Sequence, residues 1–185
     1  MSPPITITAI VGSLRRQSFN RAVFTAATEL LGEQTRLVEA DLGDVPLYNG
    51  DVEAEGDPEP VAALKHAVAT TDGLIIFTPE YNRGVPAVTK NAVDWLSRTP
   101  GASPLAEATV GIVAATPGRH EAAGVRGHLA TSITANTDRL YEPTLGLASI
   151  GHLLEDGRLT DAETRSRLAD WLGGFVQYVK ETQHD

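Results

Sequence analysis

The chain contains 185 residues, of which 42% are hydrophobic and 21% charged, and its formal net charge is −9. This length and composition are typical of one globular domain, expected here to span residues 1–185, and they exclude a disordered or fibrous chain. The absence of cysteine excludes disulfides, thiolate catalysis and iron–sulfur clusters, and the negative charge opposes binding to nucleic-acid phosphates.

The N-terminal segment does not resemble a targeting signal. It lacks the basic start and the small-residue cleavage site of a signal peptide, and no apolar run in the chain reaches the roughly 18 residues that span a bilayer. We therefore expect a cytoplasmic protein whose partners include neither nucleic acid nor a membrane.

Apolar runs mark the expected strands. The runs at residues 5–11, 73–78 and 109–115 are rich in Val and Ile and lack the alternation of a half-solvated sheet, so both faces of these strands should be covered. Two weaker runs add a strand at residues 36–41 and a broken strand at residues 139–147.

Segments with helical spacing separate these strands. Their apolar residues recur every three to four positions, which is the pattern of an amphipathic helix. The expected helices span residues 18–31, 60–70, 87–98, 120–134 and 161–182. Between the second strand and the second helix, residues 43–60 carry Gly, Pro, Asp and Glu without periodicity, which predicts a long surface loop.

The alternation of these elements predicts the fold class. Strand, helix and strand in succession form βαβ units, whose crossovers are right-handed and whose strands are parallel. The sequence therefore predicts an α/β protein with a doubly wound, five-stranded parallel sheet and helices on both faces.

The loop after the first strand is suited to bind a phosphate. It lies at the carboxyl edge of the sheet, where open α/β folds bind ligands. It carries the hydroxyls of Ser13 and Ser18 and the guanidinium of Arg15, with Arg16 beside it, and the next helix adds free N–H groups and the amide of Asn20. Neither a dinucleotide fingerprint nor a P-loop is present, which favours a terminal monophosphate. In the alternative interpretation, Ser18 only caps the helix and the arginines face water.

The loop after the third strand is suited to a flat ring. Tyr81 and Asn82 stand between Pro79 and Gly84, which describes a tight loop whose backbone can approach a ring closely, with Gly84 free to adopt positive φ. The alternative is an ordinary exposed turn. In the strand order 2-1-3-4-5, the first and third strands flank the topological switch point, so both loops would open into one crevice.

The helix after this loop is given structural roles only. Lys90 and Asp94 lie four residues apart and are expected to form a surface ion pair. Trp95 is expected in the core or in a contact between subunits.

Both loops resemble those of the NADPH-dependent FMN reductase family, which has a flavodoxin-like fold and includes quinone, azo-dye and chromate reductases. The segment Gly12-Ser-Leu-Arg-Arg-Gln-Ser-Phe-Asn20 is similar to the phosphate-binding loop of that family. The segment Pro79-Glu-Tyr-Asn-Arg-Gly-Val-Pro86, with Lys90-Asn91 and Asp94-Trp95, is similar to its isoalloxazine-binding loop and the following helix. The resemblance is strong up to about Trp95.

The resemblance implies FMN as cofactor and NADPH or NADH as electron donor, and it assigns residues by position. The FMN phosphate would be held by Ser13, Arg15, Ser18, Asn20 and the backbone N–H of Phe19. The ring and ribityl chain would be bordered by Pro79, Glu80, Tyr81, Asn82 and Arg83. A third loop begins at Thr116, which is also assigned to the cofactor, although this loop departs from the glycine-rich pattern of the family.

The function implied is an NAD(P)H oxidoreductase. A nicotinamide would give hydride to FMN and be replaced by a small acceptor such as a flavin, a quinone or an azo compound. Because the flavin supplies the chemistry, no side chain is assigned as catalytic. The five histidines show no metal-ligand spacing, so no metal is expected. The resemblance also implies a homodimer or homotetramer, with the helix at residues 87–98 as candidate contact.

Two other functions remain open from the sequence. One is a flavodoxin-like electron carrier, although flavodoxins have a Thr-rich phosphate loop and this loop is built from Ser, Arg and Asn. The other is a cofactor-free module whose crevice holds a different phosphate ester.

Overall fold

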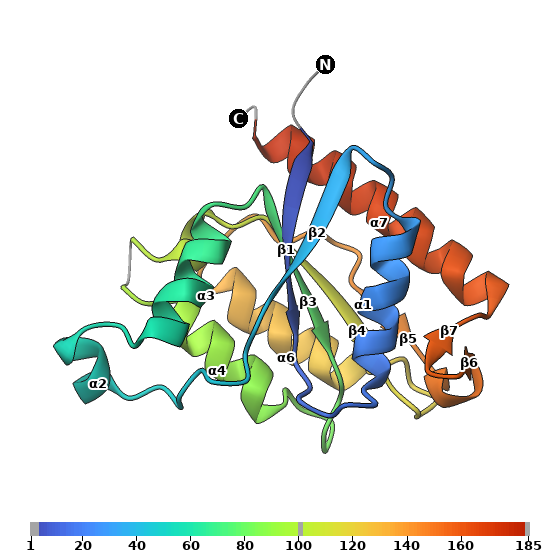
Figure 1. The fold of residues 1–185 in the computed structure, drawn as a ribbon, viewed down its shortest axis with the longest axis horizontal. Helices are drawn as coiled ribbons and strands as arrows, with labels where there is room; N and C mark the ends of the chain where they lie inside the picture. The colour runs from blue at the N-terminus through green and yellow to red at the C-terminus, as the bar shows by residue number, and fades with distance from the viewer. Residues whose placement is uncertain (1–3, 100–101, 184–185) are drawn as a thin grey trace.

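The structure, a computed structural model, describes residues 4–99 and 102–183. Residues 1–3 of the N-terminal segment lie outside this range. The main sheet has the order β2-β1-β3-β4-β5, and every neighbouring pair is parallel (Figure 1). Its strands are β1 Ile5–Val11, β2 Thr35–Ala40, β3 Gly73–Thr78, β4 Val110–Ala115 and β5 Leu145–Leu147. The predicted flavodoxin-like fold, with its five strands and their order, is confirmed.

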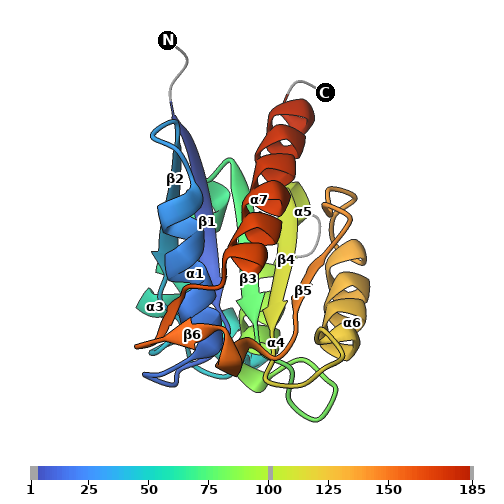
Figure 2. The ribbon, with the colours of Figure 1, turned by 90° about the vertical axis from the view of Figure 1, so that its right-hand side faces the viewer.

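Helices cover both faces of this sheet. Those at or near the expected positions are α1 Phe19–Leu30, α3 Glu59–Ala69, α4 Ala87–Leu96, α6 Ala123–Thr134 and α7 Ala162–Thr182. One apolar cluster joins α1 and α7 to one face, and a second joins α3, α4 and α6 to the other (Figure 2). Among the described residues, no helix combines the length and the apolar character that crossing a bilayer requires.

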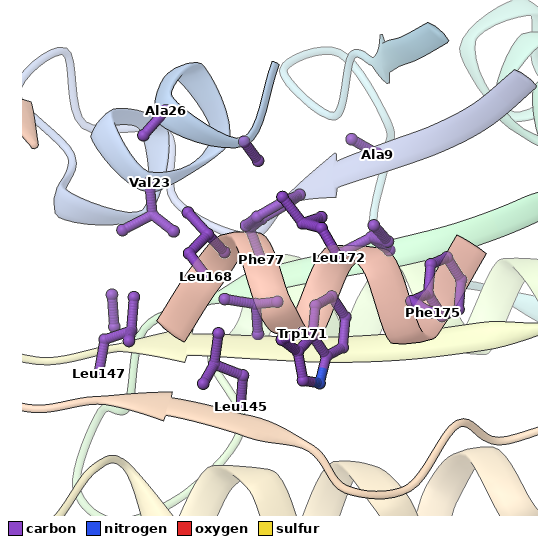
Figure 3. Close-up of a cluster of buried hydrophobic side chains, with 14 of the residues drawn as sticks. Ala9, Val23, Ala26, Phe77, Leu145, Leu147, Leu168, Trp171, Leu172 and Phe175 are labelled. Atoms are coloured by element: carbon purple, nitrogen blue, oxygen red, sulfur yellow. The ribbon is translucent and has the colours of Figure 1, made fainter. Parts of the chain in front are cut away.

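The layer under α7 shows why the strands carry unbroken apolar runs. Leu168, Trp171 and Leu172 of α7 point toward the sheet, where Phe77 of β3 is fully buried (Figure 3). On the opposite face, Ile76 packs in the cluster formed by α3, α4 and α6. Successive residues of one strand therefore enter different cores, and both must be apolar.

The fifth strand is much shorter than predicted. The chain pairs with the start of β4 at Leu140, where the Tyr141 N–H donates to the Val110 carbonyl, and then leaves the sheet before β5 resumes at Leu145. Pro143 lies in this interruption and has no N–H to donate to a ladder. The strand predicted at residues 139–147 is thus an isolated bridge followed by three paired residues.

The prediction of an irregular loop at residues 43–60 is wrong in part. A short helix, α2 Gly50–Glu55, begins after Asn49, whose side chain accepts a hydrogen bond from the Asp51 N–H at 2.9 Å. Asp51 and Glu53 stand in its first turn, where the helix dipole favours negative charge. This helix has no buried residue, so it leaves no apolar periodicity in the sequence.

Four further elements were not predicted. They are α5 Pro104–Glu107 and an antiparallel hairpin, β6 Leu154–Glu155 and β7 Arg158–Leu159. A 3₁₀ turn, Ile150–His152, precedes the hairpin. The turn residues Asp156 and Gly157 both have positive φ, of 49° and 77°, as a type I′ hairpin requires. The hairpin lies beside α1 (Figures 1 and 2).

Candidate functional site

The two loops singled out in the sequence leave the sheet from neighbouring strands. Val11 at the end of β1 is in register with Phe77 near the end of β3. The Gly12 N–H donates to the Phe77 carbonyl at 2.8 Å, so the two segments are still hydrogen-bonded where the loops begin. A side chain at Gly12 would collide with the buried Thr89 hydroxyl of α4. Glycine therefore lets the first loop start directly against α4. Both loops leave the sheet at the same edge (Figure 1).

The first loop leaves most of its polar side chains available. Ser13 and Ser18 are largely buried, whereas Arg15 and Arg16 are exposed. Ser18 caps α1, but its hydroxyl accepts from the Arg21 N–H at a long 3.4 Å. Within residues 4–99 and 102–183, no hydrogen bond or ion pair engages the side chains of Ser13, Arg15 or Arg16. These groups can therefore turn to an anion at the helix N-terminus.

Arg21 contrasts with the two arginines of the loop. Its guanidinium forms two 2.6 Å hydrogen bonds with the carboxylate of Glu39 on β2. The hydrogen bond that Arg21 donates to Glu39 is the main reason that the pKa of Arg21 is raised. Arg21 is thus held by Glu39 of β2, whereas Arg15 and Arg16 have no such partner among the described residues.

Asn20 has a different environment from its neighbours in the loop. Its side chain is 1% exposed and faces Ala115, the last residue of β4. The Ala115 N–H donates to Asn20 Oδ1 at 3.0 Å, and Asn20 Nδ2 donates to the Ala115 carbonyl at 3.1 Å. The amide therefore fastens α1 to the end of β4 and keeps one Nδ2 hydrogen for other contacts.

The second loop is a closed turn. Tyr81 and Gly84 exchange backbone hydrogen bonds of 3.3 and 2.9 Å, and the two residues between them, Asn82 and Arg83, have φ of 51° and 61°. Gly84, which was expected to be free to adopt positive φ, does not adopt it. A type I′ turn requires positive φ at its two central residues, and these are Asn82 and Arg83. The Tyr81 side chain is 48% exposed on this turn.

Contacts with α6 hold this turn in place. The Val125 N–H in the first turn of α6 donates to Glu80 Oε2 at 3.0 Å, so a carboxylate sits at the positive end of that helix. A Cβ at Gly124 would lie 2.5 Å from the Arg83 carbonyl oxygen. Glycine at this position is what permits α6 to approach the turn so closely.

The third loop also closes on itself. The Thr116 hydroxyl accepts from the Gly118 N–H at 3.1 Å, and the backbone of Thr116 bonds to Leu147 and Ile150 on the far side. Thr116 is buried at the end of β4. This loop therefore forms a fixed wall beside Asn20 and Ala115.

One cavity of about 200 Å³ brings the three loops together. Most of its lining was predicted, namely Ser13, Arg15, Ser18, Phe19, Asn20, Pro79, Glu80, Tyr81 and Thr116. Ala115 and Pro117 also line it and were not predicted, although both adjoin Thr116 in the sequence. Asn82 and Arg83 are exposed at the tip of the turn and do not line this cavity.

The site combines a flat, fixed wall with a cluster of anion-binding groups. It lies outside the carboxyl ends of β1 and β3, at the switch point of a doubly wound sheet. These features define a flavodoxin-like protein with a cavity at the switch point of its sheet.

Comparison with known proteins gives the family. The model of the NADPH-dependent FMN reductases matches residues 5–143. A quinone reductase of Pseudomonas putida is 35% identical over 97% of both chains, and an NAD(P)H-dependent FMN reductase of Pseudomonas aeruginosa is 33% identical over 97% of this chain and 98% of its own. The chain belongs to the NADPH-dependent FMN reductase family.

A solved structure agrees with this assignment. FerB, a flavoenzyme NAD(P)H:(acceptor) oxidoreductase of Paracoccus denitrificans, superposes with a TM-score of 0.86 at 28% identity and covers 96% of this chain and 98% of its own. The chain is therefore an oxidoreductase that uses FMN and NAD(P)H. The sequence-based alternatives of an electron carrier and a cofactor-free module are not supported.

Proposed function

We propose that the cavity formed by the three loops holds FMN and that the enzyme passes electrons from NAD(P)H to a quinone or a related small acceptor. The observation that carries this proposal is the union, in one cavity, of unengaged hydroxyl and guanidinium groups with the fixed turn at Tyr81. The donor set suits a phosphate monoester, and the turn suits a flat ring.

The residues divide by role along the cavity. Arg15 and the hydroxyls of Ser13 and Ser18 hold the phosphate, and the backbone N–H of Phe19 adds a donor at the start of α1. Asn20 lines the cavity beside these groups, and its remaining Nδ2 hydrogen would donate to the phosphate. The ring and ribityl chain would lie along the wall formed by Pro79, Glu80, Tyr81 and Thr116. Asn82 and Arg83, which are exposed at the tip of the turn outside the cavity, would border the ring from there.

The protein contributes placement rather than acid–base chemistry. FMN, when bound, would supply the hydride-transfer chemistry. Glu80 accepts a hydrogen bond from the Val125 N–H, which fixes the turn against the start of α6. Tyr81 is exposed at the edge of that turn, where it would border the bound ring and the donor or acceptor that reaches it.

An anaerobic absorbance experiment tests this function. The purified protein, reconstituted with FMN, is mixed with NADPH or NADH and then with a benzoquinone. Loss of the oxidised flavin band followed by its return on adding quinone is expected. Flavin that binds but stays oxidised with both nicotinamides would contradict the reductase function. Bleaching without reoxidation by quinone would contradict the acceptor.

The same proposal includes assembly as a homodimer or homotetramer. Much of α4, the contact expected from the sequence, is covered within the subunit, because the Trp95 indole and the Asn91 amide both donate to the Pro46 carbonyl. Ala87, Lys90 and Asp94 remain accessible on α4 and would form the contact. Sedimentation at micromolar concentration should show a dimer or tetramer, and a sharp monomer would contradict this.

A further inference from the structure

A second and larger cavity adjoins the first at its phosphate end. This groove has a volume of about 790 Å³ and runs between the first two turns of α1 and the β6–β7 hairpin. The two cavities share Arg15, Ser18 and Phe19, all of which belong to the phosphate loop and the start of α1. None of the turn residues around Tyr81 lines the groove. The groove therefore begins where a bound FMN would end.

The groove has the chemistry of a nucleotide site. Arg15 and Arg16 line it, and neither has an ion-pair partner in the part of the chain that the structure describes. Phe19 and Leu154 add apolar surface on opposite sides, against which a base can stack or pack. Asp156, at the far wall, supplies a carboxylate of the kind that accepts hydrogen bonds from ribose hydroxyls or an adenine amine.

The hairpin that forms the far wall is fixed. Arg158 of β7 bonds to Glu29 of α1 at 2.5 Å, and Arg165 of α7 bonds to the other Glu29 oxygen at 3.1 Å. Leu159 of β7 is buried in the core under α1 and α7. At Gly151 there is no side chain, and the nearest heavy atom to a Cβ there would be Phe19 Cζ at 3.4 Å. The groove is therefore already formed, as most small-ligand sites are.

We propose that this groove receives the adenylate half of FAD, so that the enzyme binds FAD as well as FMN. The inference rests on the proposed position of the FMN phosphate in the first cavity. FAD differs from FMN by an adenylate joined to that phosphate, and the groove opens at that point. The added phosphate carries negative charge toward Arg16, which is otherwise unpaired among the described residues.

The nicotinamide donor fits the groove less well. Its ring must reach the flavin at the turn around Tyr81, whereas the groove joins the cavity at the opposite, phosphate end. A nicotinamide dinucleotide lying in the groove would approach FMN from its phosphate end and not from its ring. The groove thus extends the flavin site rather than the donor site.

Calorimetric titration of the flavin-free protein with FMN and with FAD tests this inference. In the unmodified protein the two dissociation constants should agree within about tenfold. Thr25 is exposed on the α1 wall of the groove, so Thr25→Trp should fill it. This variant should weaken FAD binding by about tenfold or more and change FMN binding by less than about twofold. Arg16→Ala should weaken FAD binding by about tenfold through loss of a charge-assisted hydrogen bond.

Thr28→Trp is the matched control. Thr28 is exposed one turn further along α1 and does not line the groove, so it should leave both affinities unchanged. The inference is overturned if FAD binds at least about a hundredfold more weakly than FMN. It is also overturned if Thr25→Trp weakens both flavins equally, or if it raises only the KM for NADPH. Failure of FMN itself to bind would overturn the proposed function, and this inference with it.

Discussion

The two loops that form the site differ in how their polar groups are used. In the loop after β1, the side chains of Ser13, Arg15 and Arg16 make no hydrogen bond or ion pair within the described residues. In the loop after β3, the backbone is closed by the Tyr81–Gly84 pair, and Glu80 is held by the Val125 N–H. One loop keeps its donors available, and the other uses its groups to fix its own shape.

This difference follows from what each loop is proposed to hold. A phosphate brings its own charge and acceptors, and flexible donors can converge on it when it binds. A flat ring packs through its broad face, so its wall must already have the right shape before binding. Polar residues within one site can thus either remain available to bind a ligand or fix the shape of the site, and mutation can distinguish these two roles.

Asn20 should give the largest effect, because it is the residue of the phosphate side that serves structure. Asn20→Ala leaves the buried N–H and carbonyl of Ala115 without partners and should lower the free energy of unfolding by roughly 2 to 5 kcal/mol. Urea denaturation measures this. Asn136→Ala, which removes one half-buried amide contact with Ser132, is the control and should cost less than about 1 kcal/mol. Equal losses would contradict the role given to Asn20.

Gly124 tests the fixed shape of the second loop. Gly124→Ala places a Cβ 2.5 Å from the Arg83 carbonyl, so the turn must shift, at a cost of about 1 to 3 kcal/mol and with weaker FMN binding. Gly127→Ala in the same helix meets nothing within 4 Å and should stabilise the protein by about 0.5 to 1 kcal/mol. If both variants stabilise and retain FMN, close packing of the turn is unimportant.

Arg15 tests the available donors of the first loop. Arg15→Ala should raise the dissociation constant of FMN by about ten- to a hundredfold, because a charge-assisted hydrogen bond to phosphate is lost. Binding of riboflavin, which has no phosphate, should not change, and fluorescence titration measures both ligands. Arg36→Ala, an exposed arginine on β2 that lines neither cavity, is the control. Equal weakening of both flavins would show that Arg15 acts on the loop instead.

Asp161 should give the smallest effect and provides a reference for a completed helix cap. It accepts from the Thr164 N–H at 2.8 Å, whereas Ser18 accepts from the Arg21 N–H at 3.4 Å. The hydrogen bond from the Thr164 N–H lowers the pKa of Asp161, so its stabilising contribution is present at neutral pH and lost as the pH falls through that lowered pKa.

Asp161→Asn keeps an acceptor at the cap and removes the charge. The variant should therefore be slightly less stable than the unmodified protein at neutral pH, and the difference should disappear in acid. Urea denaturation at both pH values measures it. A difference that persists or grows in acid would contradict this account of the cap.

The strand order and most helices could be predicted because buried parallel strands and amphipathic helices leave periodic signals. The long apolar runs of β1, β3 and β4 and the spacing in α1 are of this kind. The hairpin at Asp156-Gly157 also left a signal, because this dipeptide between Leu-Glu and Arg-Leu is typical of a type I′ turn. That signal was missed.

Other features depend on partners distant in the sequence. Asn20 has the composition of a phosphate ligand, and its bonds to Ala115, 95 positions away, become visible only in three dimensions. Gly124 reads as an ordinary helix residue until its distance to Arg83 is known. The meeting of both loops at one cavity could be predicted, whereas the different structural roles of their residues could not.

The two tryptophans of the chain stand on opposite faces of the sheet. Trp171 lies in the layer under α7, and Trp95 lies on α4 with its ring edge against Tyr48 at 5.0 Å between centroids. Each indole is buried and donates to a backbone carbonyl, that of Pro143 or Pro46. With one tryptophan replaced by phenylalanine, the emission of the other would report on a single layer. The chain thus carries two intrinsic optical probes that can reveal whether its two layers melt together.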